Sequence, residues 1–366
     1  MINIGIVGIG DISGIYLKNI HETFRELNLV AVCDLIPERA LAAQAQYNIP
    51  KVYATMHELF ADESIQLVLN LTRPYEHFGV SKAALLAGKH VYSEKPLGAS
   101  LAEGEELVRI AAEKGLMLGG APDTFLGAGI QTCRKLIDEG TIGRVIGASG
   151  ALYSRGPESW HHDPEFFYKY GGGPMMDMGP YYVTALINLI GGVKAVTGVT
   201  RTSFPQREIT SEPFRGKIVD VEVPTFITGV LQFESGAIAT LTTTFDVCKS
   251  DHCNIEIYGE DGTVFVPDPN NFTGEIRLFD RKTKEMREIP VCFDYAENSR
   301  ALGLADLAKA IETGRRGRTT CKQTLHVLEI MESFKKSSDE GRTVELRSRF
   351  VREAPMRAGV EHGILD

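Results

Sequence analysis

INIGIVGIGDIS, residues 2–13, opens with an apolar, β-branched run and ends in a glycine-rich turn. Gly8 permits a tight turn, Gly10 lets the backbone approach a pyrophosphate, and Ser13 is small enough for close packing of helix on strand. The amphipathic pattern of residues 12–27 predicts that helix, whose first N–H groups would face the turn. This order of elements predicts a dinucleotide-binding domain.

A second apolar run, LVAVCD at residues 29–34, places an acid where the next strand ends. The carboxylate of Asp34 can accept hydrogen bonds from both hydroxyls of a ribose. It would repel a 2′-phosphate, so NAD is favoured over NADP, although Arg39 could soften that preference. Together with the glycine turn, Asp34 makes the dinucleotide interpretation specific.

Helices and short apolar strands alternate further along the chain. Residues 66–72 and 90–92 predict buried strands, and residues 77–88 and 101–114 predict helices. Helices between such strands are typical of a parallel, doubly wound α/β sheet. We therefore predict a first domain of this kind over residues 1–122.

Ligands of doubly wound sheets bind beyond the carboxyl ends of the strands, where NLTRPYEH (70–77) and SEKPLG (93–98) fall. Pro96 holds Lys95 extended, and Glu94 can hold the ammonium group or contact a ribose. A lysine fixed at the mouth of a cofactor cleft can stabilise an alkoxide or donate a proton. We assign the cofactor contacts to these loops and the preceding residues: Gly8, Gly10, Asp11, Ile12, Asp34, Arg39, Leu71, Thr72, Pro74, His77, Glu94 and Lys95.

GGGPMMDMGPYY, residues 171–182, places an acid and a phenol at helical spacing. Asp177 and Tyr181 lie one turn apart on the same face, and Tyr182 would face about 100° away. A helix N-terminal acid and a half-buried tyrosine would give the same pattern. The spacing alone therefore leaves both a catalytic and a purely structural interpretation open.

The preceding stretch, SWHHDPEFFYKYGGG at residues 159–173, contains the only tryptophan of the chain. Apolar ring faces and a few polar groups suit the CH face and the hydroxyls of a pyranose. We predict that Trp160, His161 and His162 bind the substrate together with Asp177 and Tyr181, and that the glycines let this loop close. The alternative is that these aromatic side chains pack a loop or a subunit contact.

The composition limits the function classes. A chain of 366 residues is long enough for two domains, and its net charge of −9 argues against a nucleic-acid surface. No run of 18 apolar residues occurs, so we expect a cytoplasmic protein. Cys248, His252 and Cys253 are close in sequence, but no neighbouring residue completes a zinc set, so we expect no metal.

The alternation of strands and helices ends near residue 122, so we predict a second domain over residues 123–366. Residues 124–143 predict a helix that closes on Gly140, and the segments 224–233 and 237–247 predict a hairpin.

In the second hairpin strand, Ala239 and Leu241 would face the core, and the alternating threonines would face water or another subunit. Helices are expected at 301–314 and near 320–336, followed by an arm or a disordered tail.

The motifs GIVGIGDIS, AVCD, NLTRPYEH, EKPLG and GGGPMMDMGPYY occur in the order and spacing of the Gfo/Idh/MocA family, which the chain resembles from Ile4 to about Glu332. The resemblance implies a Rossmann domain followed by an α/β domain built on a large open, mainly antiparallel sheet. It also implies that segment 301–314 packs back on the Rossmann domain, and that open sheets pair face to face in a homo-oligomer.

The same resemblance implies an NAD(P)-dependent oxidoreductase of sugars and cyclitols, with Lys95, Asp177 and position 181 at the reaction centre. Many members have histidine at that position, and Tyr181 is a departure shared by the glucose–fructose oxidoreductase branch. Phe226 also stands where related members often place histidine, so no substrate contact is carried over to it.

Oxidation of a secondary alcohol removes a hydride, which the cofactor takes, and a proton, which the protein takes. The reference pKa of a tyrosine is about 10, and the Lys95 ammonium would favour the phenolate of Tyr181. His161 or His162 is the alternative base. We predict an NAD-dependent dehydrogenase of a glucose-like ring, free or as a glycoside, with C3 as the candidate position. A glycosidase or lyase that uses transient oxidation and elimination, and a catalytically silent NAD-binding sensor, are the alternatives.

Overall fold

The computed structural model describes all 366 residues, Met1–Asp366, and divides into two compact units. The first unit consists of three separated segments, Met1–Gln131, Cys292–Leu328 and Glu353–Asp366. The second consists of Thr132–Val291 and Glu329–Arg352. These units are defined by their contacts within the structure. The boundary at residue 122 concerns domains that fold independently, and it stays a prediction.

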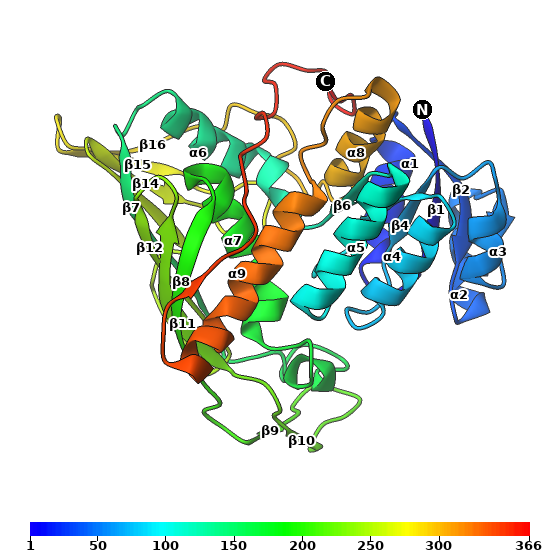
Figure 1. Cartoon of the computed structure of the whole chain (residues 1–366), viewed down its shortest axis with the longest axis horizontal. Coiled ribbons are helices and arrows are strands. Elements are labelled where there is room, and N and C mark those ends of the chain that lie inside the picture. The colour runs from blue at the N-terminus through cyan, green and yellow to red at the C-terminus, as the bar shows by residue number, and fades with distance from the viewer. The chain divides into compact units, whose positions relative to one another are not determined.

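The first unit contains the predicted parallel sheet, with strand order β3-β2-β1-β4-β5-β6 (Figure 1). All of its paired strands run parallel. The order reverses between β1 and β4, which is where such sheets bind ligands at their carboxyl ends. The strands are β1 (Ile2–Val7), β2 (Leu27–Cys33), β3 (Lys51–Val52), β4 (Leu67–Asn70), β5 (His90–Ser93) and β6 (Leu118–Gly120).

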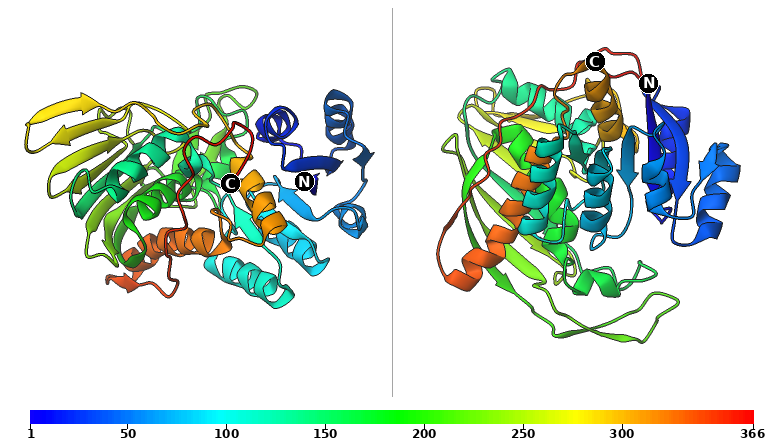
Figure 2. Two further views of the ribbon diagram at one scale, coloured as in Figure 1. Left: turned by 90° about the horizontal axis from the view of Figure 1, so that it is seen from above. Right: turned by 45° about the vertical axis from the view of Figure 1, so that its right-hand side comes forward.

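Helices cover this sheet, and α4 and α5 lie side by side in Figures 1 and 2. The helices are α1 (Ser13–Glu22), α2 (Pro37–Tyr47), α3 (Met56–Ala61), α4 (His77–Leu86), α5 (Leu101–Lys114), the short 3₁₀ helix η1 (Thr124–Leu126) and α8 (Leu302–Thr313). Helix α5 has the predicted bounds because Ser100 caps the N–H of Glu103 and Gly115 ends the helix in a left-handed conformation.

The prediction that the first helix extends to Leu27 was wrong. Helix α1 ends at Glu22, and the N–H groups of Thr23 and Phe24 both bond to the carbonyl of Asn19. Leu27 already pairs with Ile2 as the first residue of β2. Strand pairing therefore overrides a helical pattern that no glycine or proline interrupts after Gly14.

The second unit contains the large, mainly antiparallel sheet, with strand order β16-β15-β14-β13-β7-β12-β11-β8-β17. Only the pair β7–β12 is parallel. These strands are β7 (Val145–Tyr153), β8 (Val193–Arg201), β11 (Phe226–Phe233), β12 (Ile238–Thr244), β13 (Ile255–Gly259), β14 (Gly262–Val266), β15 (Arg277–Asp280), β16 (Glu285–Glu288) and β17 (Val344–Glu345).

One face of this sheet is covered and the other is open. Helix α7 (Pro174–Ile190) packs on β7, β11 and β12, and Phe334 of α9 (Cys321–Glu340) packs on Gly198 and Gly229. Ala239 and Leu241 face this covered side and are buried, as predicted, and Thr240 is exposed. Thr244, which was expected to face water or another subunit, is buried instead. A separate pair, β9 (Gln206–Glu208) and β10 (Ile218–Asp220), forms a two-stranded arm (Figure 1).

Two further sequence predictions change in the structure. The helix expected over residues 124–143 is interrupted at Gly127, whose backbone is extended, and continues as α6 (Ala128–Asp138). The C-terminal residues form an arm that packs on the first unit, with the N–H of Leu365 donating to Glu26 Oε1 at 2.8 Å, so the disordered-tail alternative was wrong. No helix in the structure combines the length and apolar composition that crossing a bilayer requires.

Candidate active site

Gly8 occupies a position that other residues cannot take without strain. Its φ is +97°, and a Cβ atom added there would lie 2.8 Å from the carbonyl carbon and oxygen of Leu71. The N–H of Leu71 donates to the carbonyl of Val7 at 2.9 Å, which holds the two strand ends together. Gly8 is therefore required both by its backbone conformation and by the close approach of the Leu71 backbone.

Gly10 differs, because a Cβ added there would meet no atom within 4 Å. Helix α1 begins three residues later, and no side chain caps its first turn. The Ser13 hydroxyl donates to the Gly10 carbonyl at 2.6 Å, which fixes the turn beyond the packing role expected for Ser13. Open space beside an uncapped helix N-terminus fits the pyrophosphate of a dinucleotide, with the backbone of Gly10, Asp11 and Ile12 nearest to it.

Asp34 is held beside this turn by two backbone hydrogen bonds. Its Oδ2 accepts from the N–H of Ile9 at 2.5 Å, and its Oδ1 accepts from the N–H of Ile36 at 2.7 Å. Each carboxylate oxygen keeps a second lone pair for a ribose hydroxyl. The half-buried carboxylate is thus oriented before a ligand arrives, while Arg39 lies on the exposed start of α2.

His77 connects the two loops that the sequence assigned to the cofactor. Its Nδ1 lies 2.7 Å from the carbonyl oxygen of Pro96, and its Nε2 lies 2.9 Å from that of Thr72. The ring is buried, and this burial lowers the pKa of His77. Both ring nitrogens face protein carbonyls, so the structure gives His77 a bridging role, and its direct contact with cofactor stays a prediction.

Asn70, at the carboxyl end of β4, was missed by the sequence analysis. Its amide donates to the carbonyl of His77 at 3.0 Å and to the Ser81 hydroxyl at 2.9 Å. Its Oδ1 accepts from the Thr72 hydroxyl at 2.6 Å. The sequence signal for this role was an asparagine at the end of an apolar strand. Asn70 is fully buried, and a buried amide must satisfy its polar atoms in the adjoining loop.

Glu94 orients the segment that carries Lys95. Its Oε2 accepts from the backbone N–H of Lys95 at 2.9 Å, and its Oε1 accepts from the Tyr16 hydroxyl at 2.6 Å. Burial and the neighbouring Glu94 raise the pKa of Tyr16 well above its ordinary value, so Tyr16 remains a donor. Lys95 is half-buried and its bond to Pro96 is cis.

In the second unit, the glycine run ends at the first turn of α7. Gly173 has a φ of +89° and precedes Pro174, whose missing N–H costs nothing at the start of a helix. The N–H of Asp177 donates to the carbonyl of Gly173 at 3.0 Å. Asp177 therefore lies in the first turn of α7, one turn before Tyr181, and its side chain is half-buried.

The two neighbouring tyrosines of α7 have different surroundings. The Tyr182 hydroxyl donates to Asn254 Oδ1 at 2.9 Å, and burial raises the pKa of Tyr182 far above its ordinary value. Tyr182 is therefore a core residue and a poor proton acceptor. Tyr181 is also largely buried, at 8% exposure, and remains the candidate of the pair.

The two histidines of the upstream loop also differ. His161 Nδ1 accepts a hydrogen bond from the N–H of Asp163 at 2.9 Å, so the neutral ring carries its proton on Nε2. The Nδ1 atom of His161 is therefore occupied as an acceptor within the loop. His162 is exposed and stacks on His161, with ring centroids 4.7 Å apart, and the neighbouring Trp160 is 66% exposed.

Two family models match the chain. Residues 2–120 match the oxidoreductase family described as having an NAD-binding Rossmann fold, and residues 130–265 match the Gfo/Idh/MocA C-terminal domain. Together they cover more than half of the sequence.

Similar proteins are sugar and polyol dehydrogenases by name. Inositol 2-dehydrogenase of Salmonella typhimurium is 30% identical over 169 residues, which are 45% of this chain and 50% of that protein. The chain thus aligns with about half the length of the first curated relatives. Myo-inositol 2-dehydrogenase of Thermotoga maritima is 23% identical over 94% of this chain and 98% of its own.

A solved structure extends the likeness of the fold to both units. The aldose-aldose oxidoreductase of Caulobacter crescentus superimposes with a TM-score of 0.78 at 25% identity, over 94% of this chain and 99% of that chain. The geometry of the glycine turn, the order of the parallel sheet and both family matches point to the same family. The chain belongs to the Gfo/Idh/MocA family of oxidoreductases, and its first unit contains an NAD-binding Rossmann domain.

Proposed function

We propose that the protein is an NAD-dependent oxidoreductase that interconverts a secondary alcohol of a sugar or polyol ring and the corresponding ketone. The observation that carries this proposal is the dinucleotide turn, where the open space at Gly10 adjoins the carboxylate of Asp34, already oriented by two backbone N–H groups. Asp34 supports NAD over NADP because its negative charge would meet a 2′-phosphate.

The cofactor-binding residues would be the turn at Gly8 to Ile12, Asp34, and the loops that begin at Leu71 and Glu94. NAD, when bound there, supplies a hydride acceptor for the carbon of the alcohol. The bridge of His77 between the carbonyls of Thr72 and Pro96 supports this assignment, because it keeps both loops in one arrangement.

Lys95 is proposed to stabilise the negative charge that develops on the substrate oxygen. Its backbone is fixed by Glu94, so the direction of its side chain is restricted where it leaves the loop. A preorganised charge of this kind acts mainly in the transition state, and it therefore affects kcat more than cofactor binding.

Tyr181 is proposed to accept the proton of the alcohol, in the branch of the family with tyrosine at this position. Tyr182 is disfavoured as the base because burial raises its pKa far above the ordinary value, and His161 is disfavoured because its Nδ1 already accepts from the N–H of Asp163. Asp177 would accept a hydrogen bond from a neighbouring ring hydroxyl. His162 is the remaining alternative base.

The proposed substrate is a glucose-like ring, free or as a glycoside, with C3 as the candidate position of oxidation. The names of the relatives, inositol 2-dehydrogenase and aldose-aldose oxidoreductase, both describe reactions of polyhydroxylated compounds. The exposed indole of Trp160 offers an apolar face for the CH groups of such a ring.

Purified protein incubated with NAD and a panel of sugars, cyclitols and glycosides tests the function. NADH absorbance that rises with one substrate supports the proposal. Release of an aglycone without net NADH would replace it with an eliminating glycosidase or lyase, and NAD binding without turnover of any substrate would replace it with a sensor.

Site variants test the assigned roles. Lys95→Met is expected to lower kcat by about 100-fold or more, with NAD affinity within about threefold of wild type. Tyr181→Phe is expected to lower kcat by about 100-fold, whereas Tyr182→Phe serves as the control that keeps kcat. If His162→Asn rather than Tyr181→Phe removes the activity, His162 is the base.

A further inference from the structure

The histidine loop, defined here as residues 155–168, carries Trp160, His161 and His162. Its position is set by the β9–β10 arm, residues 204–223, which extends from the nine-stranded sheet as a separate two-stranded element (Figures 1 and 2). Arg207 of β9 is the residue that joins the two. Its side chain is only 4% exposed, an unusual environment for a charge.

The guanidinium of Arg207 binds the histidine loop and the end of the sheet at the same time. One terminal nitrogen donates to Glu158 Oε1 at 2.9 Å and to the carbonyl of Arg155 at 3.2 Å. The other donates to the carbonyl of Phe245 at 3.0 Å and to the carboxylate of Asp246. A planar group with fixed donors can satisfy these four acceptors, and an ammonium group cannot.

Further contacts of the same arm fix the loop up to its histidines. The carbonyl of Glu158 accepts from the N–H groups of Thr210 and Ser211, each at 2.9 Å. The Ser211 hydroxyl donates to the carbonyl of His161. Because the backbone of His161 is held here and its ring is held by Asp163, the orientation of the His161 side chain depends on the arm.

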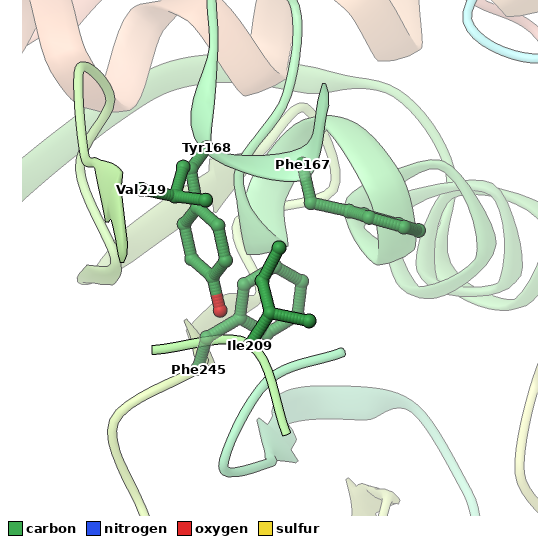
Figure 3. Packing of buried hydrophobic residues seen from close by; sticks show 5 residues of the cluster. All are labelled: Phe167, Tyr168, Ile209, Val219 and Phe245. Atoms are coloured by element: carbon green, nitrogen blue, oxygen red, sulfur yellow. The ribbon is translucent and has the colours of Figure 1, made fainter. Parts of the chain in front are cut away.

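The far end of the loop packs on the arm through apolar side chains. Figure 3 shows Tyr168 surrounded by Ile209, Val219 and Phe245, and Phe167 belongs to the same buried cluster. The carbon of the Arg207 guanidinium lies 5.6 Å from the centre of the Tyr168 ring. The loop is therefore fixed at both ends, and the exposed Trp160 lies between them.

We propose that Arg207 is a positioning residue for substrate recognition, because it fixes the histidine loop against the β9–β10 arm through Glu158 and Asp246. This proposal rests on the proposed function, in which the loop contacts the sugar. Neither Arg207 nor Glu158 needs to touch the substrate. The arm then acts as a specificity element, whose sequence determines where Trp160 and His161 meet the ring.

The decisive variant is Arg207→Lys, which keeps the charge and loses the planar donors. We expect the KM for the sugar to rise by about tenfold or more, with kcat within about threefold and NAD affinity within about twofold of wild type. Trp160 is the only tryptophan, so acrylamide quenching of its fluorescence reports the loop without any turnover, and we expect stronger quenching in the variant.

Ser211→Ala is the milder second variant, and we expect a smaller rise in KM and a smaller increase in quenching than in Arg207→Lys. Lys217→Gln is the matched control, because Lys217 binds Glu165 from the same arm at 2.5 Å but through an exposed ion pair, and it should leave KM and quenching unchanged. Thermal unfolding is compared for all variants, and a loss of fold in Arg207→Lys leaves Ser211→Ala to decide.

Unchanged quenching and KM in both variants would overturn the positioning role. Increased quenching with an unchanged KM would also overturn it, since the loop would then move without affecting the sugar. If the wild type turns over no sugar at all, the proposed function fails by its own assay, and quenching alone then decides whether Arg207 fixes the loop.

Discussion

At the scale of single residues, the two glycines of the dinucleotide turn have separable roles. Gly8 is required by the fold, because its φ is positive and the Leu71 backbone lies within 2.8 Å of an added Cβ. A Cβ atom added at Gly10 would meet no protein atom within 4 Å, so the fold itself does not require this glycine, and we propose that the approach of the cofactor does. The sequence identified both positions, but only the structure distinguishes the reasons.

Alanine at each glycine tests this distinction. Gly8→Ala is expected to destabilise the protein by about 1–3 kcal/mol or more, because it forces strained backbone and a steric clash. Gly10→Ala should change the free energy of unfolding by less than about 1 kcal/mol and weaken NAD binding by about tenfold or more. Denaturant unfolding and calorimetric titration measure the two effects. Wild-type NAD affinity in Gly10→Ala would contradict the assignment.

His77→Phe tests the bridge between the two cofactor loops. The variant keeps an aromatic ring but removes both ring nitrogens, so the carbonyl of Thr72 or Pro96 that accepts the single N–H of the neutral ring loses its donor, and we expect NAD affinity to fall by about tenfold. Because the pKa of His77 is lowered in the folded protein, the unfolded state binds its proton more tightly, and wild type loses stability as pH falls below about 6.5. Unfolding measured from pH 5 to 8 should show a smaller acid loss in the variant.

At the scale of elements, α8 is held on the parallel sheet by Asp123. The Asp123 carboxylate accepts hydrogen bonds from the N–H of Ala301 at 3.1 Å and of Gly303 at 3.0 Å, at the start of α8. Burial raises the pKa of Asp123 to about 6. An acid with a raised pKa stabilises the fold when protonated, so its contribution is lost as pH rises from about 4 to about 6.

Asp123→Asn removes this titration and keeps an acceptor for the helix start. Relative to the variant, wild type should lose on the order of 2–3 kcal/mol of its free energy of unfolding between pH 4 and pH 6. Urea unfolding of both proteins across this range measures the difference. A difference that stays constant with pH would contradict the role of Asp123.

The elements that the sequence predicted well are those with local signals. Helix α5 begins at its Ser100 cap and ends at Gly115, and both signals lie within the helix segment itself. The end of α1 was mispredicted because the pairing of Leu27 with Ile2, which ends it, is not local. The Arg207 network joins residues 38 to 52 positions apart, so no spacing rule could have found it.

The residues of the candidate site also divide into those with a local sequence signal and those without one. Gly8, Gly10 and Asp34 were predictable because a linear motif contains them, and the helical spacing of Asp177 and Tyr181 was predictable from one turn of α7. The sequence could not separate Tyr181 from Tyr182, or His161 from His162. The first distinction depends on Asn254, which only the fold brings near Tyr182. The second depends on the local conformation of the loop, which turns the N–H of Asp163 toward the His161 ring.

At the scale of the whole molecule, one face of the nine-stranded sheet is open. Across the centre of β8, β11 and β12 this face carries uncharged side chains, among them Val199, which is 65% exposed, and Thr228, which bonds to Thr242 at 2.8 Å. We propose that a second copy of the chain covers this face, because an exposed sheet face without charged side chains favours association.

Val199→Lys is expected to shift the protein toward the monomer, because a charge would then be buried in the interface. Light scattering after size-exclusion chromatography measures the mass. Val351→Lys is the control, because Val351 is 80% exposed in the same unit but lies outside the sheet, and it should leave the mass unchanged. A monomeric wild type would contradict the proposal.

The first unit is assembled from three separated segments, and this has a consequence for biosynthesis. A ribosome delivers the chain from its N-terminus, so the six parallel strands emerge well before α8, which packs on them, and before the C-terminal arm of the same unit. Domains generally fold as units during synthesis. The first unit therefore cannot complete its fold until the second unit has been translated. Until then part of its apolar surface stays exposed, and we expect chaperones to bind the nascent chain at this stage.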